Sequence, residues 1–319
     1  MLFAHVMKDG ALKRTRLSED DAVPDHVLWF DLVDPSKGEE RCIEKTLGAE
    51  VPTREEAEEI EVSSRLYREN DTLYMTATVI ARSQSEQPES TPVTFLLAGD
   101  ALVTVRYAEL SPFNVAVGKL AKSLPSEQAN GRDVLLVILD AVVDRVADVL
   151  EMTNASVDRM SREVCSPRPR KDLGDILQRL GRENDLASRV RESLMTLSRL
   201  FSFLRAVERH SSGEVRAQIG TLSRDVESLG DHAGFITNKI AFLLDATLGQ
   251  INIEQNANIK IFSVVAAVFL PPTLIASIYG MNFGHMPELG WVFGYPAALL
   301  LMLGSALFTY GLFRRRGWL

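Results

Sequence analysis

Small and polar side chains recur in the least polar part of the chain, between Lys260 and Glu288, where no Asp, Glu, Lys or Arg occurs. Counting back from Asn282, they recur at intervals of three to five residues, which places most of them on one face of a helix. The positions in this segment are Ser277, Thr273, Ala266 and Ser263, with Leu270 on the same face; Ile259 and Asn256, just before Lys260, continue it. Such a face suits a helix that borders either water or another helix.

Two interpretations of this face remain open from spacing alone. Ser, Ala and Gly often form the seam between two membrane helices. The alternative is a hydrated path along the helix. Pro271 and Pro272 in mid-segment remove amide donors and free carbonyl oxygens, which membranes tolerate only where neighbouring groups or water satisfy them. The prolines therefore favour the hydrated path.

Two apolar segments are long enough to cross a membrane as helices. Residues 261–280 form the first and residues 291–313 the second, with a short loop at 281–290 between them. Lysines precede the first segment, residues 314–319 form a basic tail with Arg314, Arg315 and Arg316, and the loop has no Lys or Arg. The positive-inside rule then predicts that both termini are cytoplasmic and that the loop is external. In a bacterium this is the inner membrane.

The chain before these segments is charged and changes its pattern once. Residues 1–110 read as an α/β domain, with strands near 28–33 and 72–81 and a hairpin at Gly99-Asp100. Capping signals predict helices after Ser36, ended at Gly48, and over 54–62 after Thr53. The strand at 72–81 is expected to be half-buried.

Residues 111–212 have a helical pattern. A short helix leads to a turn at 130–133, then to a helix over 134–164 and, after a break at 166–170, to a second helical arm near 171–209. A break at 210–213 precedes a stalk helix, 213–260, which continues into the first span despite several glycines. A single chain of this size could not cover so long a rod, so self-association is expected.

Acidic residues follow one face of the predicted helix over 134–164. They are Asp140, Asp144, Asp148 and Glu151. Like charges at this spacing repel, so a neutralising partner is expected, and Arg145 is predicted to supply part of it. The face is either a solvated surface or a diffuse attraction for divalent cations, because no compact ligand set such as an EF-hand loop is present.

Composition excludes several function classes. A formal net charge of −8 argues against nucleic-acid binding. Cys42 and Cys165 are too far apart for a zinc or disulfide motif. Nucleotide-binding and nucleophile motifs are missing, so we expect no enzyme and no cofactor. Any transport would then be driven by the membrane potential or an ion gradient.

The sequence YGMNF at 279–283 resembles the signature of the CorA family of divalent-cation channels. The likeness extends through MPEL at 286–289, GYP at 294–296 and INIEQN at 251–256. It implies an α/β cytoplasmic domain, a long-helical stalk and two transmembrane helices, assembled as a funnel-shaped homopentamer. Five copies of the first span would line the pore and the second spans would form an outer ring.

The resemblance also assigns roles to residues. Gly280, Met281 and Asn282 would form the outer selectivity ring, and Thr273, Leu270, Ile259 and Asn256 fall on the family's pore-lining positions. Glu288 would gather cations at the mouth. Family members close when magnesium binds between cytoplasmic domains, and the acidic candidates for this site here are Asp225, Asp231, Asp140, Asp144 and Asp148.

The predicted function is passive, potential-driven influx of magnesium, and also of cobalt and nickel, gated by intracellular magnesium. One alternative is a zinc transporter of the related ZntB branch, possibly proton-coupled. His285 leaves zinc as a candidate for the transported ion, because imidazole is a better ligand for zinc than for magnesium. The intact MPEL sequence favours magnesium. A second alternative is a membrane-tethered scaffold that conducts nothing.

Overall fold

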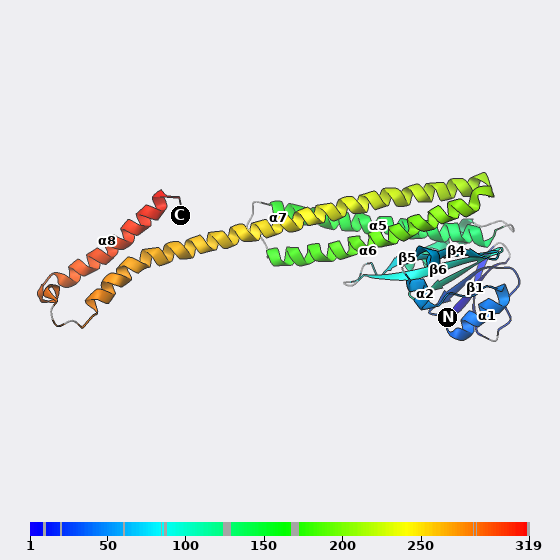
Figure 1. Cartoon of the computed structure of the whole chain (residues 1–319), viewed down its shortest axis with the longest axis horizontal. Coiled ribbons are helices and arrows are strands. Elements are labelled where there is room, and N and C mark those ends of the chain that lie inside the picture. The colour runs from blue at the N-terminus through cyan, green and yellow to red at the C-terminus, as the bar shows by residue number, and fades with distance from the viewer. Residues whose placement is uncertain are drawn as a thin grey trace. The chain divides into compact units, whose positions relative to one another are not determined.

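The computed structural model describes residues 1–8, 11–19, 21–59, 61–83, 85, 88–123, 129–166, 172–282, 284 and 286–317. These fall into two compact units, Met1–Leu244 and Asp245–Leu319, and Figure 1 shows the elements of each. The strands are β1 Leu2–Lys8, β2 Ala11–Leu17, β3 Val27–Val33, β4 Leu66–Glu69, β5 Thr72–Ala81, β6 Glu89–Ala98 and β7 Ala101–Arg106. The α-helices are α1 Lys37–Leu47, α2 Arg54–Glu58, α3 Val62–Arg65, α4 Ser111–Ser123, α5 Gly131–Cys165, α6 Leu173–Val207, α7 Gly213–Tyr279 and α8 Gly294–Arg315. Two 3-10 turns, η1 Glu208–His210 and η2 Pro287–Gly290, complete the described elements.

The first unit is built on a sheet whose described strands run in the order β2-β1-β3-β7-β6-β5-β4. Its central pair, β3 and β7, is parallel. The predicted hairpin at Gly99-Asp100 is confirmed, since Ala98 pairs with Ala101 and Gly99 has the positive φ of 56° that such a turn needs. The strands predicted near 28–33 and 72–81 are also present.

Strand β5 is buried on both faces, so the expectation of a half-buried strand was wrong. Helix α6 packs along it. The Thr78 amide donates to the Thr196 hydroxyl of α6 over 2.9 Å. The alternation of side chains along β5 predicted that one face of the strand would be exposed to solvent. Helix α6, which is distant in the sequence, covers that face.

Local capping signals place the starts of several helices. The Ser36–Glu39 capping box begins α1, which ends at Gly48 with a φ of 66°. Thr53 and Glu56 likewise begin α2. This helix ends at Glu58, earlier than predicted, because Glu59 turns to extended backbone and the separate short helix α3 follows.

Residues 130–133 are the start of α5 and not a turn before it, which corrects the prediction. The Asn130 side chain accepts hydrogen bonds from the Arg132 and Asp133 amides, so Asn130 is the N-cap. A Cβ on Gly131 would lie 2.4 Å from the Leu102 amide nitrogen of β7. Only glycine therefore lets the first turn of α5 approach the hairpin this closely.

Long helices form the rest of the first unit. Helices α5 and α6 pack against each other and are connected by residues 166–172. Residues 167–171, which include most of the predicted break at 166–170, lie outside the described residues. The first part of α7 buries apolar residues at helical spacing, including Ile219, Val226 and Ile240. Lys239 of α7 forms an ion pair with Asp158 of α5. The predicted break near 210–213 is confirmed between α6 and α7.

A buried polar network crosses the centre of the sheet. The Arg106 guanidinium donates to both carboxylate oxygens of Asp31 over 3.0 and 2.9 Å, and both side chains are at most 3% exposed. Thr104 donates to the same carboxylate and accepts from the Trp29 indole, each over 2.9 Å. His5 stacks on Trp29 at 4.2 Å, and burial lowers the pKa of its imidazole to about 4. Nothing in the sequence pattern pointed to this network.

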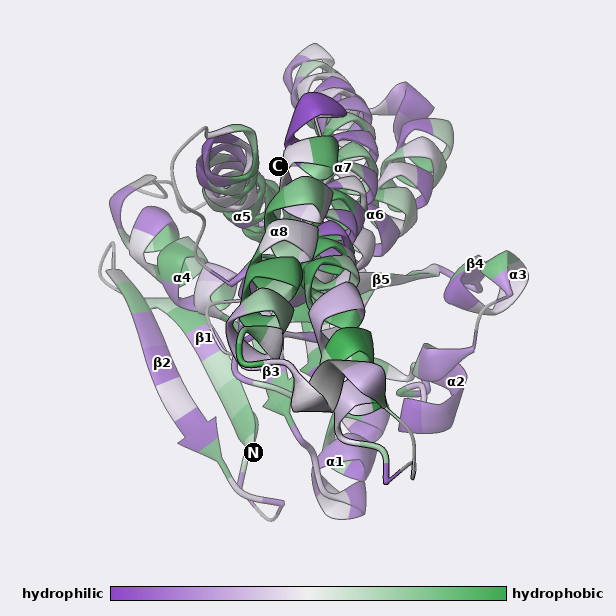
Figure 2. Cartoon of the chain, turned by 90° about the vertical axis from the view of Figure 1, so that its left-hand side faces the viewer, coloured by the Kyte–Doolittle hydropathy of each residue, from purple (hydrophilic) through white to green (hydrophobic). Residues whose placement is uncertain are grey.

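The second unit contains the end of α7, η2 and α8. Both helices are long and apolar enough to cross a membrane, with peak mean hydropathies of 2.2 and 1.7, as the two spans predicted. Figure 2 shows hydrophobic residues over much of α8. This helix begins at Gly294, later than the predicted 291, because the Gly294 amide closes a turn onto the Trp291 carbonyl over 2.9 Å. The end of α7 shows no interruption at its prolines.

Candidate functional site

The predicted polar face lies on the α7 residues of the second unit. At 100° per residue, its seven helical positions fall within an arc of about 100°, so they form one stripe. All seven are exposed in the chain, with Ile259 61% and Leu270 67% exposed. We call this set the α7 stripe: Asn256, Ile259, Ser263, Ala266, Leu270, Thr273 and Ser277.

The stripe is hollowed over its last three turns. A shallow groove of about 450 Å³ runs along Ala266, Leu270, Thr273 and Ser277. Phe269 and Leu274 complete its lining. The spacing argument had not included these two residues, although they flank the stripe by helix geometry. The groove shows that the small residues of the stripe leave space beside the helix.

The prolines change the backbone next to this groove. Because Pro271 and Pro272 carry no N–H, the carbonyls of Ala267 and Val268 lose their usual donors four residues on. The Thr273 hydroxyl donates to the Phe269 carbonyl over 2.7 Å, so its oxygen lone pairs point away from the backbone. This turn therefore offers oxygen acceptors in an otherwise apolar segment.

The chain turns at once where α7 ends. The Gly280 amide donates to the Ala276 carbonyl over 2.9 Å, and the Met281 amide to the Ile278 carbonyl over 3.2 Å. A Cβ on Gly280 would lie only 3.2 Å from the Ala276 oxygen, so a larger residue would force this turn to shift. Met281 and Asn282 are exposed just beyond it. The turn thus places an exposed carboxamide, both donor and acceptor, just beyond the end of the stripe.

The loop between α7 and α8 contains three residues singled out in the sequence: Phe283, His285 and Glu288. Phe283 and His285 lie outside the described residues. Glu288 falls in η2, and its side chain is likewise outside what the structure describes. Arg314 and Arg315 in the last turn of α8 and Arg316 at its C-cap are exposed at the carboxyl end of the helix, where positive charge is favourable.

The acidic candidates do not converge within one chain. Lys119 of α4 donates to Asp140 over 2.6 Å and to Asp144 over 2.8 Å, and these hydrogen bonds raise the pKa of its ammonium group. Lys119 therefore neutralises the Asp140 and Asp144 part of the acidic face, whereas Arg145 donates to Ser83 over 2.7 Å, contrary to our expectation.

Asp148, Asp225 and Asp231 are exposed. Among the described residues, no group of three or more His, Cys, Asp or Glu side chains is placed to hold a metal ion. A regulatory site made from these acids remains a prediction.

Comparison with known proteins decides the family. The model of the CorA-like Mg2+ transporter protein family matches residues 24–315. The chain belongs to this family. Proteins named Magnesium transport protein CorA from Yersinia pestis, Salmonella typhimurium and Escherichia coli are each 35% identical to it over 319 residues, which is 100% of both chains.

Solved structures support the CorA fold. The complete CorA magnesium transporter of Methanocaldococcus jannaschii superposes with a TM-score of 0.74 at 18% identity, covering 100% of this chain and 99% of the other. The full-length CmaX protein gives 0.66 at 15% identity, with coverages of 99% and 97%. The ZntB cytoplasmic domain from Vibrio parahaemolyticus gives 0.59 at 10% identity, with coverages of 78% and 97%. At these identities the likeness concerns the fold alone.

Proposed function

We propose that the chain forms a channel that carries magnesium into the cell down the membrane potential. The observation that carries this proposal is the exposed α7 stripe on a helix long and apolar enough to span a membrane, followed directly by Gly280, Met281 and Asn282. The full-length relatives named as magnesium transport proteins support the choice of ion. Transport is the activity that the names of these relatives state.

The chemistry of the stripe suits a hydrated ion. Magnesium gives up its water shell reluctantly, so a pore without carboxylates can hold the hexahydrated ion through its waters. The Asn282 carboxamide, the Thr273 hydroxyl and backbone carbonyls would supply these outer contacts. Cobalt and nickel ions of similar hydration are expected to follow the same path.

Several copies are needed to close the path. In one chain the groove beside Thr273 is open, and large apolar side chains such as Phe262 and Phe269 are 74% and 65% exposed. Neighbouring copies and lipid would cover both features. We propose a homopentamer in the inner membrane, with α7 around the axis, α8 outside it and both termini in the cytoplasm.

The membrane potential suffices as the driving force. A divalent cation that moves inward through 100 mV releases about 4.6 kcal/mol, twice the value for one charge. No nucleotide is required for influx of this kind. Glu288 in the external loop would raise the local concentration of cations at the mouth.

We propose that intracellular magnesium closes the channel by binding acidic residues between copies. Asp225, Asp231 and Asp148 are exposed and open to such contacts. Asp140 and Asp144 already hold Lys119, so an ion there must displace its ammonium group. Neutralising Asp225, Asp231 and Asp148 together should leave the channel conducting at high internal magnesium; closure as in the wild type would contradict this mechanism.

The proposal is tested by ion influx into proteoliposomes that contain the full chain and a magnesium- or zinc-sensitive dye. Magnesium influx that follows an imposed inside-negative potential supports it. Zinc influx that requires a proton gradient, with little magnesium movement, would move the protein to a ZntB-like activity. Influx of neither ion would favour the scaffold.

A further inference from the structure

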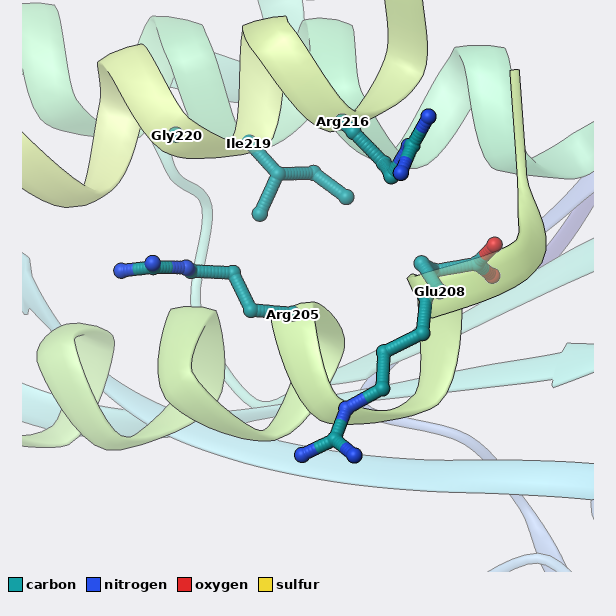
Figure 3. Close-up of a pocket in the computed structure, with 6 residues that line it drawn as sticks. Arg205, Glu208, Arg216, Ile219 and Gly220 are labelled. Carbon is teal, nitrogen blue, oxygen red and sulfur yellow. The ribbon is translucent and has the colours of Figure 1, made fainter. Parts of the chain in front are cut away.

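A small groove lies where α6 turns into α7, within the first unit. Its volume is about 260 Å³, and its lining comes from the end of α6, from η1 and from the first turns of α7. We call it the arginine groove, lined by Arg205, Glu208, Arg209, Arg216, Ile219 and Gly220. Figure 3 shows its walls, with the α7 residues facing those of α6.

Positive charge dominates the lining. Arg205, Arg209 and Arg216 are all exposed, and among the described residues no carboxylate forms an ion pair with any of them. The one acidic residue of the lining, Glu208, is only 5% exposed and already lies 2.9 Å from the Arg132 guanidinium of α5. It also accepts a hydrogen bond from the Ser211 hydroxyl. The groove thus holds an excess of positive charge on a chain whose net charge is −8.

The like charges of the groove repel one another modestly. Arg205 lies in the last turn of α6 and Arg209 follows four residues later in η1, close to the spacing at which like charges repel on a helix. Arg216 adds a third charge from the opposite wall. In Figure 3 the Arg205 side chain extends along the groove below Gly220, while the Arg216 side chain points away from the centre of the groove. Because these arginine side chains are long and point in different directions, they can rotate toward the centre of the groove when an anion binds there.

The remaining walls leave room for a ligand of limited size. The buried side chain of Ile219 lines the groove from α7, and nothing lies within 4 Å of the position that a Cβ of Gly220 would take. Ligand pockets usually measure about 300–1,000 Å³, so this groove suits a ligand smaller than most. The positive end of α7, which starts at Gly213, adds a favourable field for negative charge.

We propose that the arginine groove binds a small phosphate-bearing anion: inorganic phosphate, diphosphate or the phosphates of a nucleotide. A guanidinium matches phosphate oxygens with paired N–H donors, and three such groups together favour a di- or triphosphate over a monoanion. Such a ligand would bridge the end of α6 and the start of α7, the helix that also carries the stripe. The binding does not depend on ion conduction.

The test is isothermal titration calorimetry on the full chain in nanodiscs, in magnesium-free buffer at constant ionic strength set with chloride. Phosphate, diphosphate and ADP are titrated separately. We expect diphosphate to bind and its Kd to rise about tenfold in Arg205→Gln and in Arg216→Gln, since each removes charge-assisted hydrogen bonds. Arg205→Lys should recover part of the loss. Arg182→Gln, an exposed arginine elsewhere on α6, is the matched control and should leave the Kd unchanged.

The outcomes separate the possibilities. Tighter binding of ADP than of diphosphate assigns a nucleotide, and equal binding assigns the phosphates alone. Absence of heat for all three anions overturns the proposal. It is equally overturned if Arg205→Gln and Arg216→Gln bind as the wild type does, or if Arg182→Gln weakens binding as much as they do, because general charge would then explain the effect.

Discussion

Replacing His5 by phenylalanine should make the sheet of the first unit less sensitive to acid. His5 is 1% exposed and stacks on Trp29, and its two ring nitrogens have no hydrogen-bond partner among the described residues. Burial lowers its pKa from 6.5 to about 4. Below pH 6.5 His5 is therefore protonated in the unfolded chain but stays neutral in the folded chain. The free energy of unfolding falls as the pH is lowered, until His5 is also protonated in the folded chain near pH 4.

The size of the effect follows from this shift. A difference of about 2.5 pKa units corresponds to about 3 kcal/mol at 1.36 kcal/mol per unit, of which about 2 kcal/mol is lost by pH 5. Phenylalanine keeps the stacking on Trp29 and leaves no partner unsatisfied, so His5→Phe should be neutral or stabilising at pH 7.5. At pH 5 it should exceed the wild type by about 2 kcal/mol more than at pH 7.5.

Amide hydrogen exchange measures this difference in the full chain. The opening free energies of β1 and β3 are compared at pH 7.5 and pH 5, after correction for the intrinsic exchange rates. Titration of carboxylates affects both proteins and cancels in the comparison. Equal losses in the wild type and in His5→Phe would refute the reasoning, because His5 would then not be the group that resists protonation.

Three further predictions concern the buried ion pair and the stripe. Asp31→Ala leaves the Arg106 charge buried at 2% exposure and should cost about 3–5 kcal/mol, with Asp31→Asn costing less; hydrogen exchange of β3 and β7 measures both, and equal costs would count against a charge effect. Gly280→Ala places a Cβ 3.2 Å from the Ala276 oxygen and should lower magnesium influx severalfold at normal protein abundance; wild-type influx would show that the turn tolerates a side chain. Thr273→Phe should fill the groove and abolish influx, whereas Thr273→Ser should retain it, and retained influx with phenylalanine would place the path elsewhere.

Features set by neighbouring residues could be predicted from the sequence. The capping boxes at Ser36 and Thr53, the hairpin at Gly99 and the periodic face of α7 each depend on a few consecutive turns or strands. Their physics is local, so residue types at fixed spacing suffice. The same holds for the two spans, whose hydrophobic length decides the outcome.

Features that depend on distant contacts could not be predicted in this way. Asp31 and Arg106 are 75 residues apart and meet only because β3 and β7 are neighbours in the sheet. Lys119 contacts the acidic face of α5 from another helix, α4. Helix α6 covers the face of β5 that the alternating pattern had predicted to be exposed to solvent. The arginine groove likewise combines residues on both sides of a helical turn. Each requires knowledge of which elements pack together.

Magnesium influx under a controlled potential, compared between the wild type and Asn282→Ala, tests the central claim most directly. Ser305→Ala is the control, because the Ser305 hydroxyl bonds to the Met302 carbonyl of α8, away from the stripe. We predict that wild-type and Ser305→Ala influx rises as the inside becomes more negative and that Asn282→Ala loses most of it at equal protein abundance. Influx that is independent of potential, or that survives unchanged in Asn282→Ala, would contradict a pore that ends at Gly280, Met281 and Asn282.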